Sequence, residues 1–279
     1  MGIISKAMIE TWILPQLPIG QRGFETTVPL TEIVECIFHR LKTGCQWREL
    51  PTKQFFSDKA LHWNSVFYYY NKWSKAGCWK KIWVNLLTQN LKYLDLSSVE
   101  FDASHTPAKN GGDAVGYQGR KACKTTNTLF LSDNQGVMLA MSTPQAVQHH
   151  DLFEIQRLFE EICTLLKEAG INLQDLFLNA DPGFDSAGFR LACASEAIIA
   201  NVKPNPRNGS GEEAYQSGEH IFDEELYKDR SVIEHANGWM DGFKALLVRF
   251  EYSVRNWMSL HFMAFSIIFL RKIKRKSKV

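Results

Sequence analysis

Three acidic residues occur where a folded sheet could bring their carboxylates together. Asp102 directly follows a short apolar strand expected at 99–101, and Asp181 follows a second one expected at 176–179. Glu234 falls in a later helical segment. The ends of neighbouring strands meet at one edge of a sheet, and a helix crossing that edge can supply a third carboxylate. Clustered carboxylates need cations to compensate their charge, and two Mg²⁺ ions with such oxygen ligands could promote displacement at a phosphodiester.

A second pattern surrounds Glu234. Tyr227, Arg230 and Glu234 have i, i+3, i+7 spacing, which predicts that they share one face of a helix. Arg230 could then orient the Glu234 carboxylate or contact a phosphate. The structural alternative for Arg230 and Glu234 is an ordinary surface ion pair. The structural alternative for Asp102 and Asp181 is that they are turn or cap residues that end strands.

The elements that must position these residues follow from periodicity. Apolar residues at helical spacing predict helices at 31–44, 57–75 and 79–91, with Thr31 and Ser57 as N-caps of the first two. From residue 97 strands and helices alternate. Strands are expected at 99–101, 127–131, 137–141, 176–179 and 197–202, and helices at 151–169 and 185–195. This order predicts a mixed α/β sheet covered by helices.

The last part of the chain is expected to be helical again, from Tyr227 to about Leu270, after a polar loop at 203–219. The apolar stretch at 257–270 is shorter than the roughly 20 residues that span a bilayer, which predicts a buried helix and no membrane contact. Six scattered cysteines without a CxxC pair predict buried free thiols in a cytoplasmic protein rather than a secreted disulfide scaffold.

Charge is unevenly distributed along the chain. The net charge is +2, but it is +5 over 1–96, −10 over 97–226 and +7 over 227–279. Basic arms on either side of an acidic centre suggest a polyanionic partner. Eleven aromatic residues between positions 47 and 83 predict an aromatic core, with the alternative that some of the rings touch nucleic acid.

Four motifs occur in order along nearly the whole chain. They are TGCQWRELP (43–51) with SVFYYYNKWSKAGCW (65–79), FDASHTPAK (101–109) with GYQGRK (116–121), NADPGFDS (179–186), and Tyr-x2-Arg-x3-Glu at 227–234. Together they resemble the insertion-sequence transposases of the IS5 group, which belong to the DDE transposases. The resemblance implies a ribonuclease-H-like mixed sheet flanked by helices and preceded by an N-terminal all-helical region.

The same resemblance implies a domain order and a function. A helical DNA-binding region is expected at 1–96, a catalytic domain at 97–256, and a C-terminal helix with a basic tail at 257–279. The expected activity is binding of insertion-sequence ends, metal-dependent cleavage of their 3′ ends, and strand transfer into target DNA. Asp102, Asp181 and Glu234 would hold two Mg²⁺ ions, for which Mn²⁺ would substitute, and a homodimer or larger assembly would act on double-stranded DNA.

Residues expected to contact DNA come from two regions. They are Tyr227, Arg230 and Lys244, with Lys109, Arg120, Lys121 and Lys124 around a glycine-rich segment. The resemblance places a lysine seven residues after the glutamate, where this chain has Asp241, so Lys244 would serve in its place. Two alternatives remain at this point. One is a ribonuclease-H-like nuclease that cuts but does not join, and the other is a DNA-binding protein of transposase origin without catalysis.

Overall fold

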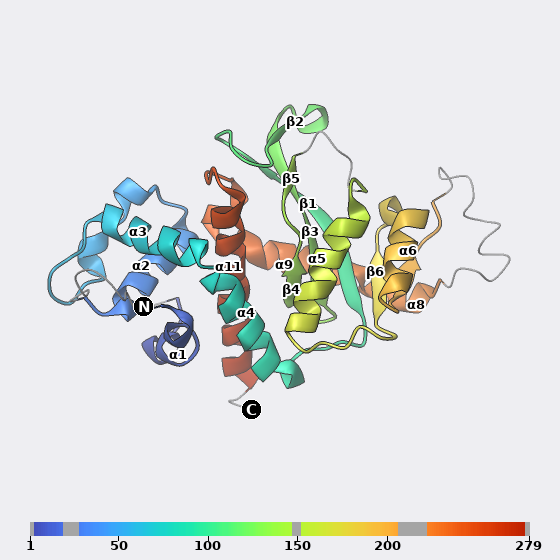
Figure 1. Ribbon diagram of the computed structural model, residues 1–279, viewed down its shortest axis with the longest axis horizontal. Helices are drawn as coiled ribbons and strands as arrows, with labels where there is room; N and C mark the ends of the chain where they lie inside the picture. Colours follow the sequence, from blue (N-terminus) through green and yellow to red (C-terminus); the bar gives the residue numbers. More distant parts are fainter. Residues whose placement is uncertain (1–2, 19–27, 147–151, 206–221, 277–279) are drawn as a thin grey trace. The chain divides into compact units, whose positions relative to one another are not determined.

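The structure is a computed structural model that describes residues 3–18, 28–146, 152–205 and 222–276 (Figure 1). The chain forms two compact units. One consists of Met1–Leu86 with Trp239–Val279, and the other of Leu87–Gly238. Most of the polar loop expected at 203–219, and Asp151 at the start of an expected helix, lie outside the described residues.

The first unit is helical, as the N-terminal periodicity predicts. Its elements are α1 (Lys6–Trp12), α2 (Leu30–Thr43), α3 (Trp63–Lys75), most of α4 (Cys78–Gln89), α10 (Lys244–Leu247) and α11 (Val254–Lys276), with 3₁₀ turns at Leu14–Gln16, Trp47–Glu49 and Thr52–Gln54. α2 ends at Gly44, whose φ of 68° closes the helix in the left-handed conformation. Its apolar face, which includes Ile33, Ile37 and Leu41, is fully buried.

Both predicted N-caps in this unit are wrong. Thr31 lies inside α2, and Pro29 is the cap residue. Ser57 does not begin a helix, because its hydroxyl donates to Oε1 of Glu32 at 2.8 Å; α3 instead starts six residues later, behind His62. A cap depends on which backbone N–H groups are left without partners, and here a tertiary contact takes the Ser57 side chain away from the helix.

Aromatic side chains contribute to the core of the first unit, and the core interpretation is confirmed for five of the eleven, which are Phe56, Tyr70, Trp73, Trp79 and Trp83. Tyr70, Trp73, Trp79 and Trp83 are at most 2% exposed. The Trp83 ring makes edge contacts with two phenylalanines of α11, at centroid distances of 5.6 and 5.7 Å. The N-terminal helices therefore share one core with the C-terminal helix.

The helix predicted from Tyr227 to Leu270 is wrong as a continuous element. The chain instead forms α8 (Glu224–Tyr227), a 3₁₀ turn η8 (Lys228–Ser231), α9 (Val232–Asp241), α10 and α11, with an irregular segment at 248–253. In that segment the buried Arg249 side chain donates to the carbonyls of Glu251 and Tyr252 at 2.9 and 3.1 Å. These bonds satisfy backbone groups that leave the helical ladder. No helix of the described chain is both long and apolar enough to cross a membrane.

The second unit contains a mixed seven-stranded sheet in the order β2-β3-β1-β6-β7, with β4 and β5 also paired to β3. The strands are β1 (Val99–Pro107), β2 (Gly116–Gln118), β3 (Cys123–Asp133), β4 (Met138–Met141), β5 (Gln145–Ala146), β6 (Phe177–Ala180) and β7 (Ile199–Val202). β1 is antiparallel to β3 and parallel to β6, and β6 is parallel to β7. The predicted mixed sheet flanked by helices is confirmed.

Two helices, α5 (Ile155–Glu168) and α6 (Ala187–Ser195), cover one face of this sheet. Phe101 of β1 lies against Phe159 of α5 and Phe189 of α6, at centroid distances of 5.6 and 5.1 Å. Successive side chains of a strand point to opposite faces, so Glu100 and Asp102 face the other side. η8, which leads into α9, contacts β1 and β6. One face of the sheet therefore packs on an aromatic core, and the opposite face carries the polar residues Glu100 and Asp102.

All six cysteines are free, as their spacing predicts. Burial raises the pKa of the Cys36 and Cys163 thiols to about 12, which keeps them protonated and unreactive near neutral pH.

Candidate active site

Asp102 and Asp181 occupy equivalent places on neighbouring parallel strands. The last paired residues of β1 and β6 are Phe101 and Ala180, and the two aspartates come immediately after them. Neighbouring strands lie about 5 Å apart, so the two carboxylates begin from adjacent backbone positions. Asp102 does not end its strand as expected. β1 continues to Pro107 because β3 pairs with it over its whole length.

Asp181 marks the point where β6 leaves the sheet. Its Oδ1 atom accepts a hydrogen bond from the Gly183 N–H at 2.8 Å and caps the short turn Pro182–Phe184. Its Oδ2 atom faces Nη1 of Arg230 at 3.8 Å, and the side chain is 48% exposed. The cap role given as the structural alternative is therefore real, yet it leaves one carboxylate oxygen directed toward Arg230 and solvent.

Arg230 links Asp181 to Glu234. Its Nη2 atom lies 3.4 Å from Oε1 of Glu234, whose side chain is 61% exposed in the first turn of α9. The guanidinium carbon of Arg230 also lies 6.0 Å from the centre of the Tyr227 ring. Tyr227, Arg230 and Glu234 belong to α8, η8 and α9 in turn. Their helical spacing nevertheless brings all three side chains together.

The carboxylates are gathered without being packed into a closed cluster. Within the described ranges, no group of three His, Cys, Asp or Glu side chains is close enough to hold a metal ion. Asp181 and Glu234 share the guanidinium of Arg230 instead. The carboxylate oxygens of Asp102, Asp181 and Glu234 are nevertheless the kind of ligand that a hard divalent cation binds. Binding one between the two aspartates and Glu234 requires these side chains to come closer together than they lie here.

Sequence reasoning missed three polar residues beneath this site. Glu100, Asn179 and Asn201 are completely buried on the neighbouring strands β1, β6 and β7. Burial raises the pKa of the Glu100 carboxyl to about 7. The available signal was spacing, because Glu100 and Asn179 each precede a site aspartate by two residues and so face the same side of the sheet.

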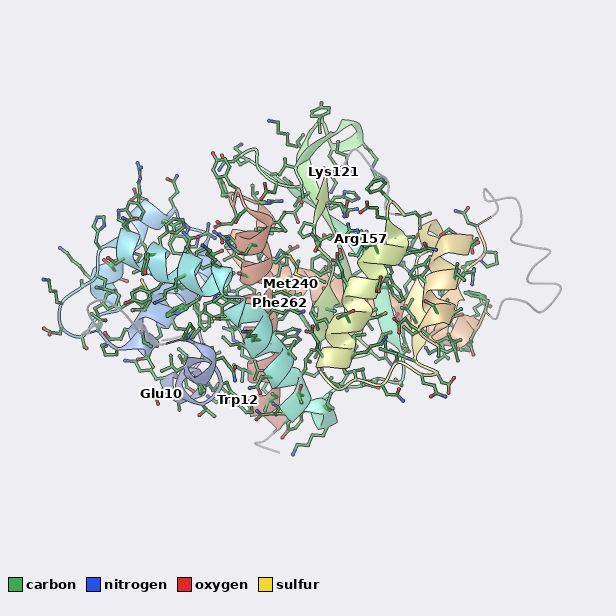
Figure 2. All side chains as sticks on the ribbon, viewed as in Figure 1. Glu10, Trp12, Lys121, Arg157, Met240 and Phe262 are labelled. Atoms are coloured by element: carbon green, nitrogen blue, oxygen red, sulfur yellow. The ribbon has the colours of Figure 1, made fainter. Side chains whose placement is uncertain are left out.

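The expected DNA-contacting residues of the central region lie together around the β2–β3 hairpin. Lys109, Arg120, Lys121 and Lys124 are all exposed. Lys121, labelled in Figure 2, donates from Nζ to the backbone carbonyl of His105 at 3.0 Å. Tyr117, which pairs with Lys124 across the hairpin, is 62% exposed. An exposed aromatic ring among cations is typical of nucleic-acid surfaces.

Lys244 belongs to the first unit, at the start of α10. Its Nζ atom donates to the backbone carbonyl of Asp241 at 3.4 Å, so this lysine and the aspartate that replaces the expected lysine are local neighbours. Their contact with DNA stays a prediction.

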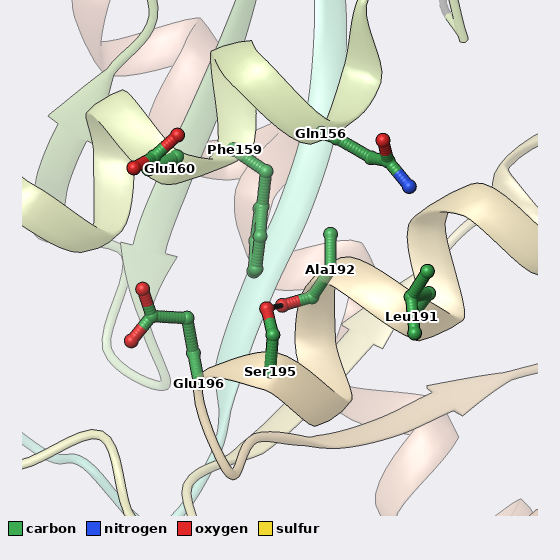
Figure 3. Close-up of a pocket in the computed structure, with 7 residues that line it drawn as sticks. All are labelled: Gln156, Phe159, Glu160, Leu191, Ala192, Ser195 and Glu196. Atoms are coloured by element: carbon green, nitrogen blue, oxygen red, sulfur yellow. Dashed lines mark hydrogen bonds between the residues drawn. The ribbon is translucent and has the colours of Figure 1, made fainter.

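A hollow of about 390 Å³ also occurs in the second unit (Figure 3). Residues of α5 and α6 and the turn that follows line it, among them Phe159, Leu191 and Glu196. Ser195, drawn in the same view, donates its hydroxyl to the Ala192 carbonyl at 2.8 Å. None of the three predicted site acids lines this hollow, so it is distinct from the candidate active site.

Comparison with solved structures gives distant likenesses. The catalytic domain of Mos1 mariner transposase is 11% identical, with 68% of this chain and 88% of that chain covered and a TM-score of 0.30. A Mos1 transposase paired-end complex with the left transposon end is 12% identical, with 89% and 80% covered and a TM-score of 0.30. No curated protein sequence matches the chain.

Two family models match the sequence. Residues 7–83 match the model described as "Putative transposase of IS4/5 family". Residues 96–268 match the model described as "DDE superfamily endonuclease", which covers the whole sheet and all three acidic residues. The order of the two matches agrees with the helical first part and the mixed sheet that follows it. The chain therefore belongs to the DDE superfamily of endonucleases and is a transposase of that superfamily.

Proposed function

We propose that this transposase binds the ends of its own insertion sequence, cleaves their 3′ ends and transfers them into target DNA, using Asp102, Asp181 and Glu234. One observation supports the proposal most directly. The register of β1 and β6 sets Asp102 beside Asp181, and Arg230 joins Asp181 to Glu234. Glu234 is thus linked through Arg230 to an aspartate that begins beside Asp102.

The donor set suits two divalent cations, Mg²⁺ or Mn²⁺, which when bound would activate the attacking oxygen and stabilise the leaving oxygen of a phosphodiester. Asp102 is paired with Phe130 of β3, which limits its movement. Arg230 orients Glu234 and partly neutralises the site, so the carboxylates can stay close before any cation binds.

Cleavage and joining can share this site, because both are in-line displacements at phosphorus. Water is the nucleophile in the first step, and the freed 3′-hydroxyl is the nucleophile in the second. Joining requires two ends to be held together, so we propose that a homodimer or larger assembly acts on double-stranded DNA. Such work on chromosomal DNA would place the protein at the nucleoid.

Contacts to the DNA backbone are assigned to the hairpin cations Lys109, Arg120, Lys121 and Lys124, and to Tyr227, Arg230 and Lys244. β3 of this hairpin pairs with β1, the strand that carries Asp102, and the hairpin itself lies next to the Pro107 end of β1. From Asp102 to Pro107 is five residues, or about 17 Å at strand rise. Duplex DNA bound at the carboxylates would therefore meet the hairpin about five base pairs away.

The test uses a supercoiled plasmid that carries the gene with its native flanking DNA. Wild-type protein with Mg²⁺ or Mn²⁺ is expected to nick discrete flanking positions and leave 3′ ends there. Glu234→Gln should lower the nicking rate about 1000-fold or more, because it removes a carboxylate from the reacting site. Glu225→Gln is the matched control, since Glu225 is an exposed α8 glutamate paired with Lys228 and should leave the rate unchanged.

Three outcomes separate the candidate functions. Nicks followed by joined products support the transposase with strand transfer. Nicks without joined products show a nuclease that only cuts. Specific binding without any nick, in wild type and Glu234→Gln alike, shows a DNA-binding protein without catalysis.

A further inference from the structure

A row of buried polar side chains crosses three neighbouring strands of the sheet. Glu100 on β1, Asn179 on β6 and Asn201 on β7 are each 0% exposed. Nδ2 of Asn179 donates to Oε1 of Glu100 at 3.2 Å, and Nδ2 of Asn201 donates to Oδ1 of Asn179 at 2.7 Å. Strands that are buried on both faces normally carry apolar residues, so a row of buried polar side chains is unusual here.

The row binds the backbone that begins α8. Asn201 donates from Nδ2 to the Asp223 carbonyl at 2.9 Å and accepts at Oδ1 from the Asp223 N–H at 2.8 Å. Asn179 donates from Nδ2 to the Leu226 carbonyl at 2.9 Å. Asp223 in turn caps α8, because its Oδ1 accepts from the N–H groups of Glu225 and Leu226. A side-chain amide is well suited to this task, since it can donate and accept at once.

The segment held in this way leads directly to the candidate site. α8 ends at Tyr227, η8 contains Arg230, and Glu234 lies in the first turn of α9. Asn179 stands two residues before Asp181 on the same face of β6. The row therefore connects the strands that carry the aspartates with the helical segment that carries the arginine and the glutamate.

We infer that Asn179 and Asn201 are positioning residues. They fix the start of α8 to the sheet and thereby set Arg230 and Glu234 against Asp181. Two uncharged amides in a sheet interior are costly unless all their bonds are made, and here those bonds end on the backbone of α8. The role of this row in catalysis rests on the proposed function, whereas its hydrogen bonds to the α8 segment do not depend on that function.

The experiment replaces Asn201 with leucine, which has similar size and loses both bonds to Asp223. Amide hydrogen exchange is expected to become at least about 10-fold faster in peptides covering 223–235 and to stay unchanged in β1 and β3. The rate of nicking at saturating DNA should fall about 10–100-fold, as for loss of other groups that orient metal ligands. The Kd for the DNA end should change less than the nicking rate, because the hairpin cations are untouched and only Tyr227 and Arg230 of the assigned DNA contacts lie in the loosened segment.

Asp133→Asn is the matched control. Asp133 is a buried polar residue of β3 that pairs with Val99 of β1, and its side chain faces the side of the sheet opposite Glu100. It accepts from the Val137 and Asp95 N–H groups at 2.7 and 3.0 Å. Its replacement is expected to lower Tm without changing either the exchange of 223–235 or the nicking rate. This control separates positioning from a general loss of stability.

If Asn201→Leu does not fold, Asn179→Ala serves as a second variant, because it keeps the bonds from Asn201 to Asp223. It should also speed up amide exchange over 223–235 and lower the nicking rate. A folded variant with wild-type exchange over 223–235 and a wild-type nicking rate overturns the inference. If wild-type protein does not nick DNA, the proposed function fails. Faster exchange in Asn201→Leu would then still show that the row holds the α8 segment.

Discussion

At the scale of residues, Arg230 decides how the acidic side chains of the site coexist. It lies between Asp181 and Glu234, at 3.8 and 3.4 Å, and only about a quarter of its side chain is exposed. A lysine would supply the charge but not the planar fork that reaches two carboxylates at once. The site therefore has a built-in cation that compensates part of its negative charge.

Another residue, His261, makes the stability of the protein depend on pH. Burial within α11 lowers the pKa of its imidazole to about 4, and Nδ1 lies 3.0 Å from the Trp257 carbonyl. In the unfolded chain the pKa is about 6.5, so on acidification the unfolded state binds the proton first. The contribution of neutral His261 is therefore complete above pH 6.5 and is lost as the pH falls toward 4, by about 3 kcal/mol.

His261→Gln should remove most of this dependence, because glutamine does not titrate. The measurement is the free energy of unfolding in urea at several pH values between 4 and 7.5. His39→Gln serves as the comparison, since burial also lowers the pKa of His39 but its side chain is only partly buried. An unchanged slope in His261→Gln would contradict the assignment.

At the scale of elements, two helix ends with the same backbone conformation have different surroundings. Gly44 after α2 and Gly77 after α3 both have a φ of +68°. A Cβ atom at Gly44 would lie 2.9 Å from the Lys244 carbonyl carbon and 3.0 Å from its oxygen, whereas a Cβ at Gly77 meets nothing within 4 Å. One glycine permits a close backbone approach, and the other permits only a turn.

Alanine at the two positions should therefore have unequal costs. Gly77→Ala is expected to lower the free energy of unfolding by about 1 kcal/mol, from left-handed strain alone. Gly44→Ala adds a clash with backbone that cannot turn aside and should cost about 3 kcal/mol. Urea unfolding of both variants measures the difference, and equal losses would show that α10 moves freely away from Gly44.

The β2–β3 hairpin is the element whose charge we expect to show in DNA binding. Replacing Arg120, Lys121 and Lys124 with glutamine should reduce the slope of log K against log salt by about 2–3, since each phosphate contact contributes about 0.9. The measurement is the affinity for an element end between about 50 and 200 mM salt.

A double replacement on α5, Arg157→Gln with Lys167→Gln, is the matched control for the hairpin. Arg157 pairs with Glu154 and Glu161, and Lys167 pairs with Glu196, so their charges are already partly compensated. The control should retain the wild-type salt slope. A wild-type salt slope in the hairpin variant would show that the DNA does not contact the hairpin.

At the scale of the whole molecule, the first unit is assembled from both ends of the chain. The Tyr70 hydroxyl donates to the Asn256 carbonyl at 2.7 Å, and Arg40 forms a buried ion pair with Glu251 at 3.2 Å. Removing one partner of a buried ion pair leaves an uncompensated charge, which typically costs 3–5 kcal/mol. The N-terminal helices therefore depend on residues 186 and 211 positions away in the sequence.

A fragment of residues 1–96 is accordingly expected not to unfold cooperatively, because Trp83 loses both phenylalanine partners and Arg40 loses Glu251. Joining residues 239–279 to it by a flexible linker should restore a cooperative thermal transition followed by circular dichroism. Residues 87–238, which contain a complete sheet and its own core, should melt cooperatively alone. A sharp transition in the 1–96 fragment would contradict this dependence.

The sequence by itself determined the kinds of elements and the identity of the candidate acids. Glycine at the end of α2, the apolar run before Asp181 and the spacing of Arg230 and Glu234 are local features. Propensity, turn chemistry and helical period act over a few residues, so they can be deduced without the fold. The helical N-terminal region and the mixed sheet followed from these features.

Only the tertiary structure decided how distant segments pair. β1 continues beyond Asp102 because β3 supplies hydrogen bonds along its polar second half, and no local pattern encodes that partner. The predicted long C-terminal helix breaks where Arg249 is buried against backbone carbonyls, and the row from Glu100 to Asn201 exists only when three strands are in register. Burial and pairing depend on residues far apart in the chain, which is why spacing within the sequence could not reveal them.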